Sequence, residues 1–270
     1  MLPSWPERLC IALLPDRLAW VVLSRGRHIR AQGCVPVGPA KEGGDWHAVV
    51  EALQRELPGM PVESGNVSVV LSNAFVRYLV IQSSSQLTSM EERLALVRHD
   101  YQQVYGALAE TWEIRLADGE SRYLTAAIDH DLLAQLRDSF SSTRFKLDHV
   151  QPHAVAAFNH WIKLFNDKSP EGIFMVEPHG YCYAGIGKGD WKFVRCGRWE
   201  GTPLETFQRV VQRETLRTGN EMSKVWFSAL LEKKELDGIS ALEGVELLPL
   251  DNVLKEASRP ECMMAVLGSQ

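Results

Sequence analysis

The chain has 270 residues, of which 45% are hydrophobic and 23% charged, a composition typical of a globular protein with one large domain or two lobes. Its formal net charge of −5, with basic residues scattered among acidic ones, excludes the basic stripe that binds a nucleic-acid backbone. The apolar runs at 9–14 and 18–23 are far shorter than the roughly 20 residues that span a bilayer. Residues 1–8 lack a signal-peptide pattern, and the five cysteines include no C-x-x-C pair, so we expect a cytoplasmic protein with reduced thiols.

A three-stranded pattern occurs twice, at residues 10–30 and again at 172–195. Each copy has an apolar strand, a turn containing proline, a second apolar strand, a glycine turn and a third strand of alternating polarity. The pattern predicts two three-stranded meanders. A repeated meander indicates that the chain consists of two related halves.

Each meander is followed by a helix and then by a buried strand. Asp45 is expected to cap the first helix, and Thr202 with Glu205 forms the spacing of a capping box at the start of the second. The strands that follow are predicted at 67–72 and 223–230, and a last strand at 245–250. The order of meander, helix and strand is therefore the same in both halves.

The first half contains an additional mixed segment at residues 75–147. Ser89 and Glu92 have capping-box spacing at the start of a helix whose apolar stripe includes Tyr101. The other predicted elements are a strand at 75–81, a hairpin at 112–116 and 123–128, a helix at 131–140 and a strand at 145–150. These elements predict a small α/β subdomain inserted into the first half. A helix predicted at 153–165 then closes that half.

This layout resembles the ribonuclease H-like lobe that is duplicated in the actin and sugar-kinase superfamily. Within it, the chain is similar to PilM-type pilus assembly proteins and to the cytoplasmic domains of MshI- and GspL-type secretion proteins. The stretches that carry the resemblance are 69–78, 91–105, 112–128 and 148–152. It implies a mixed α/β fold with a first lobe at 1–165 that includes the inserted subdomain, a linker at 166–171 and a second lobe at 172–270.

The resemblance also implies a function. Proteins of the pilus type are cytoplasmic scaffolds at the inner membrane, and a groove beside the inserted subdomain takes a short cytoplasmic peptide from a membrane partner. The corresponding partner-binding candidates in this chain are Phe75, Arg77, Tyr78 and Tyr101. A soluble regulator that binds an unrelated partner through the same surfaces is a further hypothesis.

Nucleotide chemistry in this superfamily needs an Asp-x-Gly type of hairpin in each lobe to hold metal-bound phosphates. The first turn instead has Asp16 beside Arg17, and the second has Glu177, a proline, His179 and Gly180. We therefore expect a non-catalytic member with no cofactor and no metal. The alternative is an atypical ATPase or small-molecule kinase that uses ATP and magnesium through Asp16 and Glu177.

Active members of the superfamily also have a glycine pair that lets adenosine approach. At the corresponding position this chain has the bulky residues Trp226 and Phe227, which would obstruct a base.

Three other patterns invite a chemical interpretation. Residues 129–131 have three potential metal ligands but are more typical of a helix start, and residues 148–153 have an Asp and two His without a nucleophile turn. Residues 185–190 resemble a phosphate loop but lack its spacing, which favours a hairpin turn.

Overall fold

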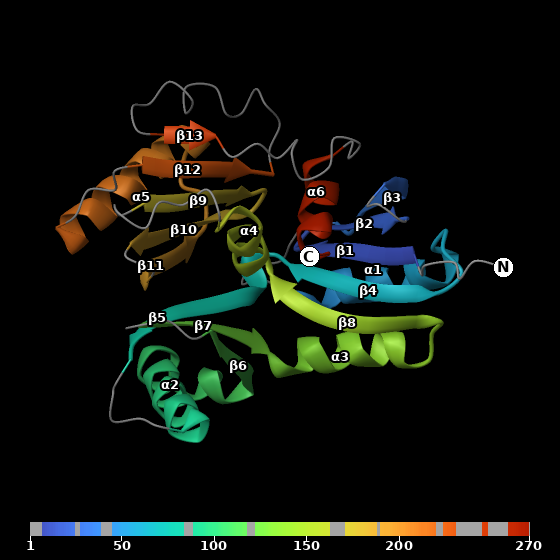
Figure 1. The fold of residues 1–270 in the computed structure, drawn as a ribbon, viewed down its shortest axis with the longest axis horizontal. Coiled ribbons are helices and arrows are strands. Elements are labelled where there is room, and N and C mark those ends of the chain that lie inside the picture. The colour runs from blue at the N-terminus through green and yellow to red at the C-terminus, as the bar shows by residue number, and fades with distance from the viewer. Residues whose placement is uncertain are drawn as a thin grey trace. The chain divides into compact units, whose positions relative to one another are not determined.

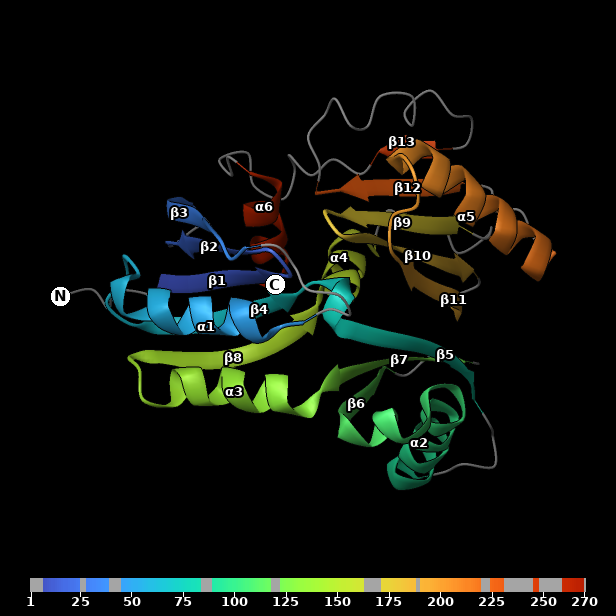
Figure 2. The same cartoon turned by 180° about the vertical axis from the view of Figure 1, so that it is seen from behind.

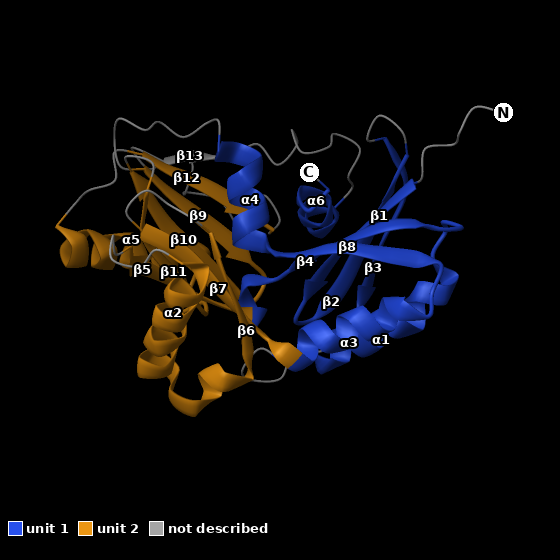
Figure 3. Cartoon of the chain, turned by 60° about the horizontal axis from the view of Figure 1, so that its bottom comes forward, with its two compact units in different colours: residues 1–75, 131–162, 249–270 blue, residues 76–130, 163–248 orange. Residues whose placement is uncertain are grey.

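The computed structural model describes residues 7–24, 28–38, 45–83, 89–117, 122–162, 171–187, 190–219, 224–230, 245–247 and 259–269. The chain forms two compact units (Figure 3). Unit 1 contains residues 1–75, 131–162 and 249–270, and unit 2 contains residues 76–130 and 163–248.

Unit 1 has a five-stranded sheet with the order β3-β2-β1-β4-β8. The strands are β1 (Glu7–Leu14), β2 (Arg17–Leu23), β3 (Ile29–Pro36), β4 (Gly65–Leu71) and β8 (Phe145–Pro152). β1 lies between antiparallel β2 and parallel β4. Its residues 9–14 are fully buried, as the continuous apolar run of a central strand requires.

Helices cover both faces of this sheet (Figures 1 and 3). α1 (His47–Glu56) packs against β1 and β2 on the face that also carries α3 (His130–Ser141). α6 (Pro260–Leu267) packs against β1, β2 and β4 on the other face, and α4 (His153–Trp161) contacts α6. The last described residues of the chain therefore complete the core of unit 1.

Unit 2 repeats the strand order of the unit 1 sheet, with a five-stranded sheet of order β11-β10-β9-β12-β13 (Figure 2). The strands are β9 (Glu171–Glu177), β10 (Gly180–Gly187), β11 (Asp190–Gly197), β12 (Lys224–Ala229) and β13 (Val245–Leu247). α5 (Pro203–Thr218) follows the meander, and its first turn has the predicted capping box of Thr202 and Glu205. Phe174 lies at the centre of the aromatic core, stacked on Tyr181 and Phe227.

The duplication extends to individual hydrogen bonds. In unit 1 the residue after β4, Ser72, donates its backbone N–H to the carbonyl of Leu13, and in unit 2 Leu230 donates to Val176 in the same way. Both first hairpins close over two residues, because Leu14 pairs with Arg17 and Glu177 pairs with Gly180. The predicted repeat of meander, helix and strand is confirmed.

The remaining strands form a separate sheet of order β5-β7-β6 within unit 2. They are β5 (Val76–Gln82), β7 (Arg122–Asp129) and β6 (Trp112–Ala117), and α2 (Met90–Tyr105) packs on them with a short 3₁₀ turn at Gly106–Thr111. Ser89 and Glu92 form the predicted capping box. Further 3₁₀ turns lie at Leu57–Gly59 and Asn73–Phe75.

The predicted elements need two corrections. α1 begins at His47 after Trp46, whose side chain makes no capping bond, while the Asp45 carboxylate accepts the His47 N–H at 3.1 Å. Asp45 is therefore one residue outside the expected cap. Helix α6, of eight residues, was not predicted from the sequence. The predicted linker at 166–171 lies, except for Glu171, outside the described residues, as does the predicted end of the last strand.

Candidate functional site

The first hairpin turn holds its carboxylate against its own arginine. Asp16 lies in the two-residue turn between β1 and β2, and its two oxygens accept hydrogen bonds from Arg17 Nε at 3.0 Å and Nη2 at 2.7 Å. This is a bidentate pair, the strongest geometry that a guanidinium and a carboxylate form. The backbone carbonyl of Asp16 accepts the Val37 N–H at 2.8 Å, which holds the turn in place.

Arg17 also reaches a second carboxylate. Its Nη1 donates to Oε1 of Glu261, a residue in the first turn of α6 that is 244 positions away in the sequence. The side chains of Arg17, Asp16 and Glu261 are 31%, 18% and 8% exposed. The hydrogen bond with Asp16, and after it the charges of Asp16 and Glu261, raise the pKa of Arg17 above its usual value. The three residues form a bridge between the turn and α6, called here the Arg17 bridge.

The second turn keeps the proline of the first and differs from it at the three other positions. The matching registers place His179 where unit 1 has Asp16, and Gly180 where it has Arg17. Glu177, the retained carboxylate, ends β9 with 4% exposure, and its backbone carbonyl accepts the Trp199 Nε1–H at 3.0 Å. A Cβ at Gly180 would come within 2.5 Å of the Gly197 carbonyl oxygen. The close approach that requires this glycine is therefore to the end of β11.

Trp226 and Phe227 both belong to the interior of unit 2. Trp226 Nε1 donates to Glu171 Oε2 at 2.7 Å in a buried hydrogen bond, and Phe227 packs edge-on against Phe207. Both aromatic rings are less than a tenth exposed. The two bulky side chains predicted at this position are therefore part of the packed interior of unit 2.

The four predicted partner-binding residues differ in exposure. Tyr101 is fully buried, and Phe75 and Tyr78 are 6% and 7% exposed. The Tyr101 hydroxyl donates to the Arg77 carbonyl at 2.9 Å, which fixes α2 to β5. Arg77 is partly exposed, so it is the member of the set whose side chain reaches the surface most. A role of these residues in partner binding stays a prediction.

The other patterns singled out in the sequence have structural explanations. α3 begins at His130 with Asp131 in its first turn, and Asp148 pairs with Arg8 at 3.9 Å. His149 Nε2 lies 2.5 Å from the Gly268 carbonyl at the end of α6. Gly187 pairs with Asp190, so the predicted hairpin between β10 and β11 is confirmed. Among the described residues, no three His, Cys, Asp or Glu side chains are grouped to hold a metal ion.

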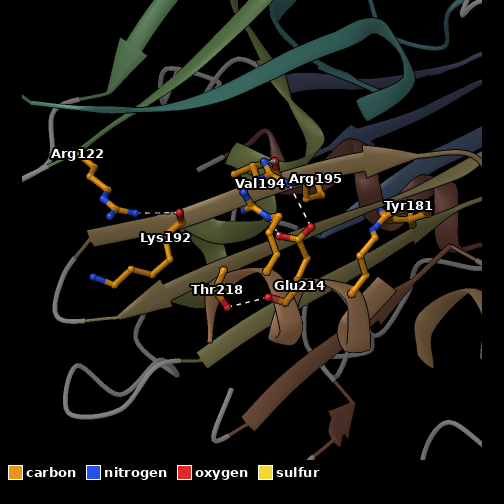
Figure 4. A network of polar contacts seen from close by, with 9 residues as sticks. Arg122, Tyr181, Lys192, Val194, Arg195, Glu214 and Thr218 are labelled. Carbon is orange, nitrogen blue, oxygen red and sulfur yellow. Dashed lines mark hydrogen bonds and ion pairs between the residues drawn. The ribbon is translucent and has the colours of Figure 1, made fainter. Parts of the chain in front are cut away.

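A polar network in unit 2 was not anticipated from the sequence (Figure 4). Glu214 on α5 is 3% exposed and accepts hydrogen bonds from Arg195 at 3.3 Å and Arg217 at 2.9 Å. Arg122 of β7 donates to the carbonyl of Lys192 on β11 at 3.0 Å, which joins the β5-β7-β6 sheet to the larger sheet. The Arg195 and Glu214 positions lie 19 residues apart, so local spacing gives no signal for this pair.

The architecture has clear counterparts among solved structures. The chain has the actin-like ATPase fold, as shown by a structure of that description from Bacteroides thetaiotaomicron with a TM-score of 0.63, 13% identity, and coverage of 99% of this chain and 98% of that one. A PilM–PilN type IV pilus biogenesis complex gives a TM-score of 0.72 at 14% identity, with the same coverage of both chains.

A third similar structure is the cytoplasmic domain of EpsL, an inner-membrane component of the type II secretion system of Vibrio cholerae. It has a TM-score of 0.59 and 11% identity, and the match covers 97% of this chain and 93% of that domain. The chain matches no protein-family model and no curated protein sequence. At these identities the likeness establishes the fold, and the predicted fold class is confirmed. In the part of the chain that the structure describes, no helix combines the length and apolarity needed to cross a membrane.

Proposed function

We propose that this protein is a non-catalytic actin-like scaffold in the assembly of a type IV pilus-like or type II secretion-like machine. The similarity to PilM in the PilM–PilN complex and to the EpsL cytoplasmic domain supports the kind of machine. The observation that carries the non-catalytic part is the Arg17 bridge, because it occupies the turn that holds phosphates in an active relative.

The contacts of the bridge oppose the binding of a metal-bound phosphate. Both oxygens of Asp16, the carboxylate that could contact a magnesium ion in this turn, already accept hydrogen bonds from Arg17. The positive charge of the guanidinium beside them would repel the metal. Nε and both Nη atoms of Arg17 donate to Asp16 and Glu261, so the guanidinium has these donors in use and does not offer them to phosphate oxygens.

We therefore expect no saturable binding of ATP with magnesium. A ligand at 100 times its dissociation constant would add about 2.7 kcal/mol to the free energy of unfolding, which a thermal-shift titration readily detects. We expect no shift across a range of ATP–magnesium concentrations. A concentration-dependent rise in melting temperature that is lost in Asp16→Ala or in Glu177→Ala would support the alternative, an atypical ATPase or kinase.

The proposed partner is an inner-membrane pilus or secretion protein that presents a short cytoplasmic peptide, which would place this chain in the cytoplasm at the inner membrane. Crosslinking in native cells, followed by purification of the tagged chain and mass spectrometry, tests this. We expect a pilus or secretion membrane component in the wild-type sample and at least a tenfold lower yield with Arg77→Glu.

Arg115→Glu is the matched control for that substitution. Arg115 lies on β6 of the same small sheet as Arg77, and its side chain is 80% exposed and paired with Glu113. We expect this variant to recover the partner as the wild type does. Recovery of the intact bait without any such membrane component would overturn the proposed function.

A further inference from the structure

Two cysteines of unit 2 face each other across adjacent strands. Cys182 of β10 and Cys196 of β11 are direct partners in the antiparallel register. Directly opposed residues point to the same face of a sheet, and their Cα atoms lie about 4.5 or 5.5 Å apart according to the type of pair. Both spacings fall inside the range of about 4.4–6.8 Å found for disulfides.

The two thiols have different access to solvent. Cys182 is fully buried, whereas Cys196 is exposed. A hydrogen bond with the Cys196 thiol, followed by burial, holds the pKa of Cys182 well above its usual range. An oxidant in solution therefore meets Cys196 first, and the neutral Cys182 thiol lies behind it.

The pair is separated from the aromatic core of the same sheet. Tyr181 and Tyr183, the residues on either side of Cys182, belong to that core, so Cys182 faces away from it. Tyr78 of β5 lies close enough to both cysteines for their charges to act on its pKa, which burial raises first and most strongly. The small sheet therefore covers the buried member of the pair.

We propose that Cys182 and Cys196 form a redox modification site that hydrogen peroxide converts to a cross-strand disulfide. Peroxide takes two electrons from the Cys196 sulfur, its O–O bond breaks, and Cys196 becomes a sulfenic acid as one water leaves. The Cys182 sulfur then attacks the Cys196 sulfur, the S–O bond breaks, and the oxygen leaves as a second water with the Cys182 proton. In sum, two thiols and one peroxide give one disulfide and two waters.

Peptide mapping of the intact, folded chain tests this directly. Trypsin cuts after Lys188 and Arg195, so Cys182 lies in peptide 169–188 and Cys196 in the tripeptide 196–198. After brief peroxide treatment and blocking of the remaining thiols, we expect these two peptides joined, with a mass lower by two hydrogen atoms than their sum. We expect Cys10 and Cys262 to remain thiols, because both are buried and the pKa of Cys262 is raised to about 12.

Two variants separate the roles of the cysteines. In Cys182→Ala, the Cys196 sulfenic acid has no thiol to attack it, and we expect at least tenfold more labelling of Cys196 by dimedone than in the wild type. In Cys196→Ser, we expect neither the joined peptides nor labelling of Cys182. If Cys196 of the wild type is oxidised while the joined peptides are absent, the proposal is wrong, and this outcome is readable even if Cys182→Ala does not fold.

Discussion

Replacing Arg17 by methionine should lower the free energy of unfolding by about 3 kcal/mol, the cost of leaving charged hydrogen-bonding groups without their partner in a poorly solvated place. Methionine keeps much of the apolar stem of arginine but removes all three donor groups that contact Asp16 and Glu261. The carboxylate of Glu261, with 8% of its side chain exposed, would then have little water to replace the lost bond. The midpoint of urea unfolding measures the change.

Arg30→Met is the matched control for this substitution. Arg30 also lies on the sheet of unit 1 and pairs with a carboxylate, that of Glu7, at 2.7 Å, but its side chain is 49% exposed. Exposed pairs of this kind contribute about 0–1 kcal/mol. If Arg17→Met shifts the urea midpoint no more than Arg30→Met does, the Arg17 bridge does not hold α6 to the turn.

A double-mutant cycle measures the coupling between Arg17 and Glu261. Glu261→Gln keeps the shape of the side chain and removes its charge, so its effect should be smaller in the Arg17→Met background than in the wild type. The coupling between contacting groups in one network is about 0.5–3 kcal/mol. Additive effects of the two substitutions would show that Arg17 and Glu261 act independently.

The sequence predicts the repeated parts of the fold because their signals are local. Proline turns, capping boxes and continuous apolar runs all lie within a few residues, and the structure confirms the meanders and the helices that follow them. The sequence does not predict α6, because the position of this helix depends on contacts with residues far away in the chain. Glu261 contacts Arg17 across 244 positions, and no local pattern indicates such a contact.

For the candidate sites, too, the sequence predicts local features but not the contacts between elements. An apolar stripe predicts which face of α2 is buried, and Val97 and Tyr101 are indeed fully buried. The stripe does not predict how much of the helix is buried, since Met90 and Val104 at its two ends are 49% and 58% exposed. Likewise, the sequence shows that Asp16 and Arg17 are adjacent, but it does not show that they pair in a bidentate way or that Arg17 also contacts Glu261.

Tyr101→Ala is expected to cost about 4 kcal/mol, within the range for removing a large aromatic residue from a core. Tyr101 is fully buried and makes an edge-on contact with Trp112, with ring centroids 6.2 Å apart. Burial raises its pKa above the usual range, so the hydroxyl stays protonated and donates to the Arg77 carbonyl. Amide hydrogen exchange should show the loss first in α2 and β5.

Two further substitutions at α2 distinguish packing from a surface role. Met90→Ala, on the same helix but 49% exposed, should change the free energy of unfolding by less than about 0.5 kcal/mol. Tyr101→Phe keeps the ring and removes the hydroxyl that lies between the Arg77 carbonyl and Thr125, so we expect a loss of about 1 kcal/mol. A Tyr101→Ala variant as stable as the wild type would contradict the buried position of this ring.

The pair of tyrosine variants also bears on partner binding. If Tyr101 acts by supporting β5 beneath Arg77, partner recovery should fall with Tyr101→Ala and remain near the wild-type level with Tyr101→Phe. The reason is that the ring, which fills the space between α2 and the sheet, is absent only in the alanine variant. A loss of partner with Tyr101→Phe at unchanged stability would instead show that the hydroxyl itself contacts the partner.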